Sequence, residues 1–192
     1  MPLQIRKFSE DDIPYKVKWI NDHGNNSYLS YDLPLREDQT LLWYRAIVDR
    51  TDRADYTITC DDEPVGLIGL LNIDDKNKKA EYYIVLGGAS HKGKGVADIA
   101  ISLLMEESFG KYGLSKVYAY VEIGNKSAQR MCERMGFIKE GLLREDISKE
   151  GKRIDRFVYG LLVQEWCIKQ HSPSANRHIY SLDECQRQGD TV

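Results

Sequence analysis

Residues 81–97 read EYYIVLGGASHKGKGVA, and this stretch decides which folds the chain can adopt. It opens with the end of a predicted strand, residues 80–86, which is rich in β-branched and aromatic side chains. A glycine-rich loop follows and leads into an amphipathic helix predicted from about residue 96 to residue 112. Gly93 and Gly95 let the backbone approach a ligand closely, and the start of the helix presents N–H groups at a positive dipole end. With Lys92 and Lys94 beside it, the loop suits a diphosphate group.

Other phosphate-binding loops fit this stretch less well. It lacks the G-x-x-x-x-G-K-[ST] spacing of a nucleotide P-loop, and it lacks the G-x-G-x-x-G pattern of a dinucleotide-binding turn. Its strand ends a series of short strands and does not open a β-α-β unit. A flexible surface turn with solvated lysines is the plain alternative, and the loop by itself does not exclude it.

The elements around the loop predict an α+β fold in one domain. The period-2 and helical patterns, read with their turn signals, give the order β-α-α-β-β-β-loop-α-β-α-β-β. This order corresponds to a mixed, mostly antiparallel sheet of about seven strands with helices on both faces. The predicted strands are 3–8, 56–60, 65–73, 80–86, 116–123, 137–147 and 153–163, and the predicted helices are 9–24, 36–49, 96–112 and 125–135. We expect the domain to span residues 1–170, with a polar, poorly ordered tail over residues 171–192.

Composition excludes several classes of protein. The 192 residues carry a net charge of −3 with acids and bases mixed along the chain, which argues against a nucleic-acid binder. No apolar run approaches the length of a membrane-spanning helix, and the start lacks a signal-peptide pattern, so we expect a cytoplasmic protein. The four Cys and four His do not fall at metal-ligand spacing, so no metal is expected.

Two signatures together resemble the GNAT superfamily of N-acetyltransferases. Lys92-Gly-Lys-Gly95-Val-Ala97 is similar to the family's acyl-CoA pyrophosphate loop. Asn125-Lys-Ser-Ala128, followed by Met135-Gly-Phe137, resembles its second signature, a helix that ends in Gly-Phe. The final run, GFIKEGLLRED…GKRIDRFVYGLL, is similar to spermidine acetyltransferases and ribosomal-protein N-terminal acetyltransferases. Nucleotide-amino-sugar acetyltransferases are also similar in the amino-terminal part.

The resemblance implies acetyl-CoA as co-substrate and assigns residues to it. Backbone groups of the strand before the loop would pair with the pantetheine arm, loop amides would hold the diphosphate, and an Asn would contact the CoA moiety further along. The residues so assigned are Ile84, Val85, Leu86, Lys92, Gly93, Lys94, Gly95, Val96, Ala97 and Asn125. Each has a plainer interpretation, since apolar strand residues fill any sheet core and Asn125 could simply cap the helix that follows.

The resemblance also implies a direct attack of a primary amine on the thioester. Glu81 matches the acidic residue that helps to deprotonate the amine in relatives, although a charged residue at a strand edge is often only solvated. Cys132 stands where many relatives have the Tyr that protonates the leaving thiolate. A thiol can donate this proton, but a buried Cys is more often an inert apolar side chain, and we favour that interpretation. Tyr118 and Tyr120 are substitutes if they do not lie in the core.

The acceptor stays open between a polyamine, an amino sugar and a protein N-terminus. The resemblance places acceptor specificity in the first two helices and the loop between them, where Tyr28, Tyr31 and Asp32 are the candidate contacts. Ordinary rim packing explains these Tyr residues equally well. The competing function is a non-catalytic acyl-CoA-binding regulatory module, suggested by Cys132 in place of Tyr. Relatives are often homodimers, but no interface stands out in this sequence.

Overall fold

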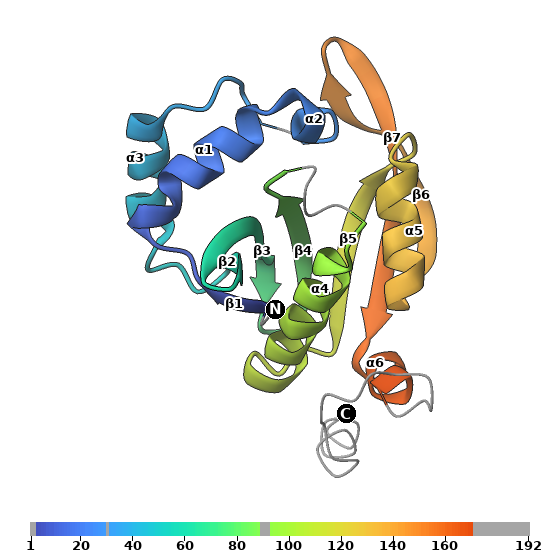
Figure 1. Ribbon diagram of the computed structural model, residues 1–192. Helices are drawn as coiled ribbons and strands as arrows, with labels where there is room; N and C mark the ends of the chain where they lie inside the picture. Colours follow the sequence, from blue (N-terminus) through green and yellow to red (C-terminus); the bar gives the residue numbers. More distant parts are fainter. Residues whose placement is uncertain (1–2, 30, 89–92, 171–192) are drawn as a thin grey trace. The chain divides into compact units, whose positions relative to one another are not determined.

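The computed structural model describes residues 3–29, 31–88 and 93–170. Lys92 and the predicted tail, 171–192, lie outside these ranges, so the predictions made for them stay predictions. The strands are β1 (Leu3–Lys7), β2 (Ala54–Cys60), β3 (Glu63–Asp74), β4 (Lys79–Leu86), β5 (Lys116–Glu122), β6 (Ile138–Lys149) and β7 (Lys152–Leu162). The helices are α1 (Ile13–Asn21), α2 (His23–Asn26), α3 (Glu37–Ile47), α4 (Val96–Glu106), α5 (Lys126–Met135) and α6 (Val163–Gln170) (Figure 1).

The strands form one mixed sheet in the order β1-β2-β3-β4-β5-β7-β6. β4 and β5 run parallel, with Glu81 opposite Tyr118, while β1–β2, β2–β3, β5–β7 and β6–β7 are antiparallel. The predicted α+β fold with a mostly antiparallel seven-stranded sheet is therefore confirmed. Along the chain, contacts group into two compact units, Met1–Ile73 with Tyr82–Leu104, and Asp74–Glu81 with Met105–Val192, which we call unit 1 and unit 2.

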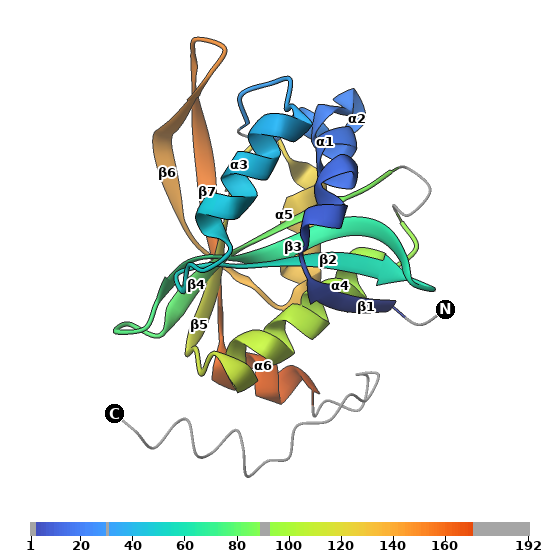
Figure 2. The ribbon, with the colours of Figure 1, turned by 90° about the vertical axis from the view of Figure 1, so that its left-hand side faces the viewer.

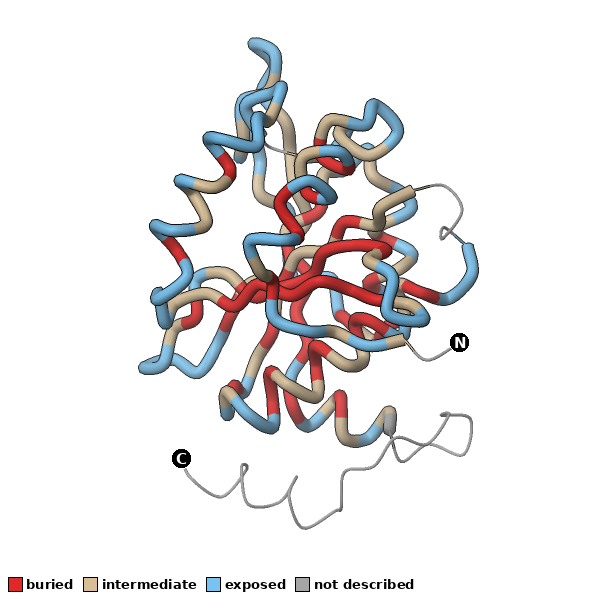
Figure 3. The backbone as a smooth tube through the Cα atoms, turned by 60° about the vertical axis from the view of Figure 1, so that its left-hand side comes forward, coloured by how far each residue is buried: buried red, intermediate tan, exposed pale blue. Residues whose placement is uncertain are grey.

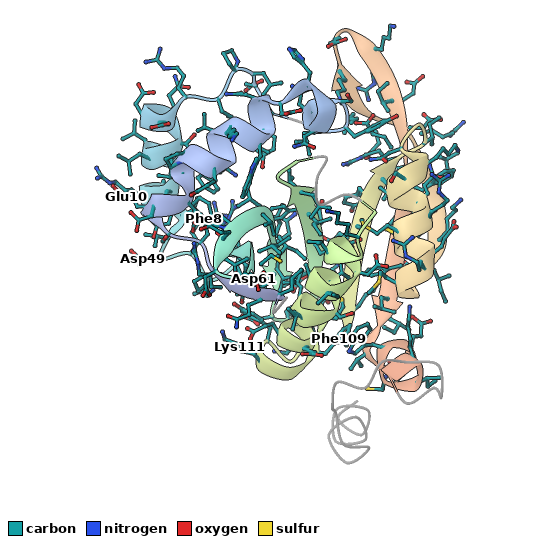
Figure 4. All side chains as sticks on the ribbon, viewed as in Figure 1. Phe8, Glu10, Asp49, Asp61, Phe109 and Lys111 are labelled. Carbon is teal, nitrogen blue, oxygen red and sulfur yellow. The ribbon has the colours of Figure 1, made fainter. Side chains whose placement is uncertain are left out.

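Unit 1 packs α1 and α3 onto its strands. β2 and the middle of β3 are buried almost continuously, as the red tube in Figure 3 shows, and α1 and α3 lie on the same side of these strands in Figure 2. Phe8, labelled in Figure 4, packs edge-on against Trp43 with ring centroids 6.0 Å apart. The apolar core here comprises Phe8, Ile13, Trp19, Ile20, Leu67 and Val85.

The start of α1 is fixed by capping. The backbone N–H of Ser9 donates to Asp12 at 2.9 Å, and Arg6 donates twice to the same buried carboxylate, at 2.7 Å each. The predicted helix 9–24 is divided in the structure, because α1 ends at Asn21 and Asp22 then caps α2 by accepting from Gly24 N–H at 2.7 Å. An Asx-type cap at position 22 competes with continuation of the helix.

Unit 2 is built on β5, β7 and β6 with α5 beside them. Val117, Ala119 and Val121 of β5 are buried, and the intervening residues are only partly buried. α5 ends at Gly136, whose φ of +93° is the left-handed conformation that favours Gly after a helix. The sequence did not predict α6, a two-turn helix that buries Trp166 to 1% exposure. Eight residues beside a polar segment give too short a periodic pattern.

Candidate active site

Strand β4 carries the residues assigned to the pantetheine arm. Val85 is 7% exposed and belongs to the unit 1 core. Ile84 and Leu86 are partly buried and alternate with it, so they face the other side of the strand. The next residue, Gly87, lies so close to Trp19 that a Cβ at this position would overlap the indole. The end of β4 is therefore held against α1.

The glycine loop leads into α4, which begins at Val96, where the sequence predicts a helix start. Gly93 and Gly95 have φ of +75° and +79°, and a Cβ added to either would meet no atom within 4 Å. The carbonyl of Gly95 accepts the N–H of Ile99 at 3.1 Å, so the helix begins immediately after it. The first N–H groups of a helix have no acceptor within the helix. Conformation and not crowding is what requires Gly at these two positions.

In unit 2, Glu81 lies beside the two tyrosines of β5. Glu81 and Tyr118 are partners across the parallel strands, and the rings of Tyr118 and Tyr120 lie 5.5 Å apart. Partial burial raises the pKa of Tyr118, and the negative charge of Glu81 raises it further. Neither Tyr is in the core, because the buried face of β5 is formed by Val117, Ala119 and Val121, which alternate with the two tyrosines. A carboxylate and two phenols thus share one face of these strands.

Asn125 and Cys132 lie at opposite ends of the first two turns of α5. The side chain of Asn125 accepts the N–H of Ala128 at 3.0 Å, which is the capping role considered for it. Cys132 is 1% exposed and is not part of a disulfide. Its neighbour Tyr159 is fully buried, and this burial, with a hydrogen bond to Glu133 at 3.2 Å, raises the pKa of Tyr159 to about 12. The surroundings of Cys132 are thus those of a core residue.

Of the three residues proposed to contact the acceptor amine, Tyr31 makes contacts with a buried cation. Tyr28 and Tyr31 are 44% and 38% exposed, and Asp32 is exposed as well. Tyr31 accepts a hydrogen bond from the Lys16 ammonium at 3.4 Å. The Lys16 Nζ also lies 5.2 Å from the centroid of the Tyr31 ring. The three residues are therefore not equivalent, since Tyr31 covers a cation.

The structure reveals a polar cluster in unit 1 that the sequence did not predict. Asp55 accepts two hydrogen bonds from Arg53, at 2.7 and 2.8 Å, and one from the Tyr83 hydroxyl at 2.6 Å. The ammonium of Lys16 and the guanidinium of Arg53 lie 4.2 and 5.1 Å from the centroid of the Trp43 ring. We call this group the Lys16 cluster; its members are Lys16, Tyr31, Trp43, Arg53, Asp55 and Tyr83.

Burial dominates the electrostatics of the Lys16 cluster. Lys16 is only 4% exposed, and burial lowers its pKa to about 8, with Asp55 opposing the shift and Arg53 adding to it. Burial also raises the pKa of Tyr31, and raises that of Tyr83 well above its usual value. The sequence contained a signal for the buried cation, because Lys16 falls on the inward stripe of α1 with Ile13 and Ile20.

Comparison with known proteins identifies the family. The family described as "Acetyltransferase (GNAT) domain" matches residues 3–138. The chain belongs to the GNAT acetyltransferase family. The uncharacterized N-acetyltransferase p20 of Bacillus licheniformis is 35% identical over 169 residues, covering 85% of this chain and 94% of that protein. The spermidine N(1)-acetyltransferase of Escherichia coli K12 is 31% identical over 152 residues, covering 78% and 80%.

Solved structures share the fold. The Vibrio cholerae spermidine N-acetyltransferase, solved in complex with CoA and spermine, superposes with a TM-score of 0.79 at 24% identity, covering 86% of this chain and 98% of that one. The family match and the relatives that are 31% and 35% identical show that the chain is an N-acetyltransferase. Within residues 3–29, 31–88 and 93–170, no helix is long and apolar enough to cross a membrane. No group of three or more His, Cys, Asp or Glu residues in the same ranges could hold a metal ion.

Proposed function

We propose that this GNAT chain transfers the acetyl group of acetyl-CoA to a primary amine by direct attack in a ternary complex. The observation that carries the proposal is the loop before α4. Two glycines with positive φ stand there in open space, directly before the first turn of a long helix. Such a loop supplies backbone N–H donors and a positive dipole end for a diphosphate. Lys94 adds a positive charge at the same place.

The remaining CoA assignments have supporting features. The backbone of residues 84–86 is the proposed partner of the pantetheine arm, and alternation along β4 leaves Ile84 and Leu86 outside the unit 1 core. Asn125 caps α5 through its side-chain oxygen, while its amide nitrogen has donors left for a ligand. The proposed contacts of Lys92 fall on a residue that the structure does not describe.

The transfer needs three things from the protein. The acceptor ammonium must lose a proton, the thioester carbonyl must be polarised, and the CoA thiolate must be protonated as the C–S bond breaks and the N–C bond forms. Glu81 is the proposed proton acceptor, acting through water. For the thiolate, Cys132 is the residue at the family position, but its burial supports the inert role that we favour. Tyr118 and Tyr120 are partly exposed phenols and are the better candidates.

The acceptor is proposed only as a primary amine. Spermidine is the first compound to test, because a relative that aligns with 78% of the chain is named for it. An amino sugar and a peptide N-terminus remain alternatives, with Tyr28, Tyr31 and Asp32 as candidate contacts. These three residues lie in the loop between α2 and α3.

The test is thiol release from acetyl-CoA against a panel of polyamines, amino-sugar nucleotides, amino acids and short peptides. We expect turnover on one class, and we expect Cys132→Ala to retain most of it while Tyr118→Phe or Tyr120→Phe loses at least tenfold in kcat. Acetyl-CoA binding with no turnover on any amine would favour the regulatory module. A large loss of kcat in Cys132→Ala with normal acetyl-CoA binding would show that the Cys132 thiol protonates the leaving thiolate.

A further inference from the structure

The Lys16 cluster places charged side chains in the buried part of unit 1. Lys16 lies on the buried stripe of α1, Asp55 lies within the buried strand β2, and Trp43 faces them from α3. Burying charged groups costs free energy unless each finds partners, and replacing such groups with apolar side chains is often stabilising. A buried cation whose hydrogen-bond donors are not all used is therefore a candidate binding group.

Hydrogen-bond capacity within the cluster is unevenly used. Asp55 is satisfied, because its two oxygens accept three hydrogen bonds from Arg53 and Tyr83. Lys16 has three N–H donors and uses one of them, in a long 3.4 Å hydrogen bond to the Tyr31 oxygen. Among the residues that the structure describes, no carboxylate oxygen lies within 4.0 Å of its ammonium nitrogen. Arg53 also retains donors beyond the two that Asp55 accepts.

The unsatisfied groups are therefore all donors, and their charge is positive. Lys16 and Arg53 contribute two positive charges to the cluster, and Asp55 contributes one negative charge. The Tyr31 hydroxyl accepts from Lys16 and keeps its own proton to donate. An oxyanion would satisfy these donors and supply the missing counter-charge. A second ammonium group would add a third positive charge and would meet a carboxylate that already accepts three hydrogen bonds.

The Tyr31 side chain lies between the Lys16 ammonium and the exposed loop before α3. Tyr31 is 38% exposed and lies over the ammonium, whereas Lys16 itself is 4% exposed. A carboxylate that displaces the phenol oxygen of Tyr31 would exchange a weak, neutral acceptor for a charge-assisted one. Tyr31 also belongs to the loop before α3 that is assigned to the acceptor.

We infer that the Lys16 cluster is a carboxylate-recognition site, and that the acceptor amine of this enzyme is an amino acid carrying a free carboxylate. The inference rests on the proposed acetyl transfer and specifies its acceptor class. Lys16 binds the carboxylate, Arg53 adds positive potential and donors, and Asp55 holds Arg53 in place through two hydrogen bonds. A polyamine offers no anion to this site and is disfavoured by its net positive charge.

The experiment compares amino acids with the amines that remain when the carboxylate is removed. Lysine is paired with cadaverine, ornithine with putrescine, and phenylalanine with phenethylamine, and spermidine is included. We expect kcat/KM to be at least tenfold higher for the amino acid of the preferred pair. In Lys16→Met, the ratio of kcat/KM for the amino acid to kcat/KM for the decarboxylated amine should fall close to one, because only the value for the amino acid decreases. KM for acetyl-CoA should stay unchanged.

Lys18→Met is the matched control, because Lys18 is an exposed cation on the same helix. It should keep the wild-type ratio. Equal or better turnover of spermidine or the decarboxylated amines by the wild type would overturn the inference, as would an unchanged ratio in Lys16→Met. The carboxylate could also come from an acidic peptide. Dipeptide amides with Asp or Asn at the second position test this alternative. A higher kcat/KM for the Asp peptide than for every free amino acid would overturn the assignment to amino acids.

A binding measurement keeps the two proposals distinguishable. Calorimetric titration of the amino acids into the wild type and Lys16→Met needs no turnover and no acetyl-CoA. Binding to the wild type that is lost in Lys16→Met supports the carboxylate site even if acetyl transfer fails. Acetyl transfer to amines without any such binding difference would uphold the proposed function and overturn the carboxylate site.

Discussion

At the scale of single residues, Lys16 shows how burial of a charged side chain lowers the stability of the folded chain. Lys16 is only 4% exposed, and its ammonium lies 4.2 Å from the centroid of the Trp43 ring, where a cation–π contact stabilises it. This contact and the field of Asp55 do not offset burial completely, because the pKa of Lys16 is still lowered to about 8. The folded chain therefore binds this proton less tightly than the unfolded chain does.

The depressed pKa predicts a pH dependence of stability. The unfolded chain holds the Lys16 proton up to a pKa near 10.5, and the folded chain releases it near 8, so this residue destabilises the fold below pH 8. The destabilisation declines as the pH rises from about 8 to about 10.5. We expect Lys16→Met to be more stable than the wild type at pH 7, on the order of 2–3 kcal/mol, and the difference to shrink over that window.

Denaturant titrations of the wild type, Lys16→Met and Lys18→Met at several pH values between 6.5 and 10.5 measure this difference. Lys18 is exposed, so its substitution should change stability little at any of them. A Lys16→Met variant less stable than the wild type at pH 7 would mean that the Lys16 ammonium is well compensated. A variant that gains stability while losing selectivity for carboxylates is the pattern expected of a binding group.

At the scale of secondary-structure elements, α5 illustrates a helix whose two ends are fixed by sequence. Asn125 caps the first turn at 3.0 Å, and Gly136 ends the helix with φ of +93° and donates its N–H back to Glu133 at 3.1 Å. Both features belong to residue types that prefer these positions for local reasons. The helix thereby presents Cys132 to the core at a fixed position.

Substitutions of Asn125 separate its capping role from the proposed contact with CoA. Asn125→Asp keeps an acceptor for Ala128 N–H and should leave stability within about 0.5 kcal/mol, whereas Asn125→Ala should lose about 1 kcal/mol. If the amide nitrogen contacts CoA, both variants weaken acetyl-CoA binding. Thermal unfolding and calorimetric titration of the two proteins decide between the roles. Full affinity in both variants would leave Asn125 with the cap alone.

At the scale of the whole chain, acetyl-CoA binding should couple to folding. A ligand that binds only the folded state stabilises it by about 2.7 kcal/mol at a hundredfold excess over Kd. We expect acetyl-CoA, but not ATP or NAD, to raise the melting temperature by several degrees. Gly95→Val should abolish the increase, because φ of +79° disfavours a β-branched residue.

Gly95→Val should otherwise leave most of the fold intact, since its side chain would meet open space. Gly151→Val is a control for strain alone, because Gly151 has φ of +75° in a hairpin turn and is equally uncrowded. An equal acetyl-CoA response in the wild type and Gly95→Val would remove the loop from the proposed binding site. Loss of the response in Gly151→Val would show that a general loss of stability, and not the loop, is responsible.

Local order in this chain follows from the sequence alone. Alternation predicts the strands, turn residues predict the hairpin at residues 149–152, and the glycine-rich loop before residue 96 predicts where α4 begins. These features depend on neighbours in the chain, because backbone sterics, capping and side-chain periodicity act over a few residues. Even the family was recognisable from two such local patterns, at residues 92–97 and 125–137.

Tertiary structure alone decided which polar groups meet. Periodicity shows that Lys16 lies on the inward stripe of α1, but it does not show that Trp43 and Asp55 lie close to its ammonium group. It likewise leaves open whether Tyr118 or its neighbours form the buried face of β5, and whether Cys132 is exposed or enclosed. Each answer depends on contacts between residues far apart in sequence, which arise only when helices and strands pack. The sequence therefore determined the family and most of the elements, apart from α6 and the division of the first helix, and packing determined the surroundings that give each side chain its chemistry.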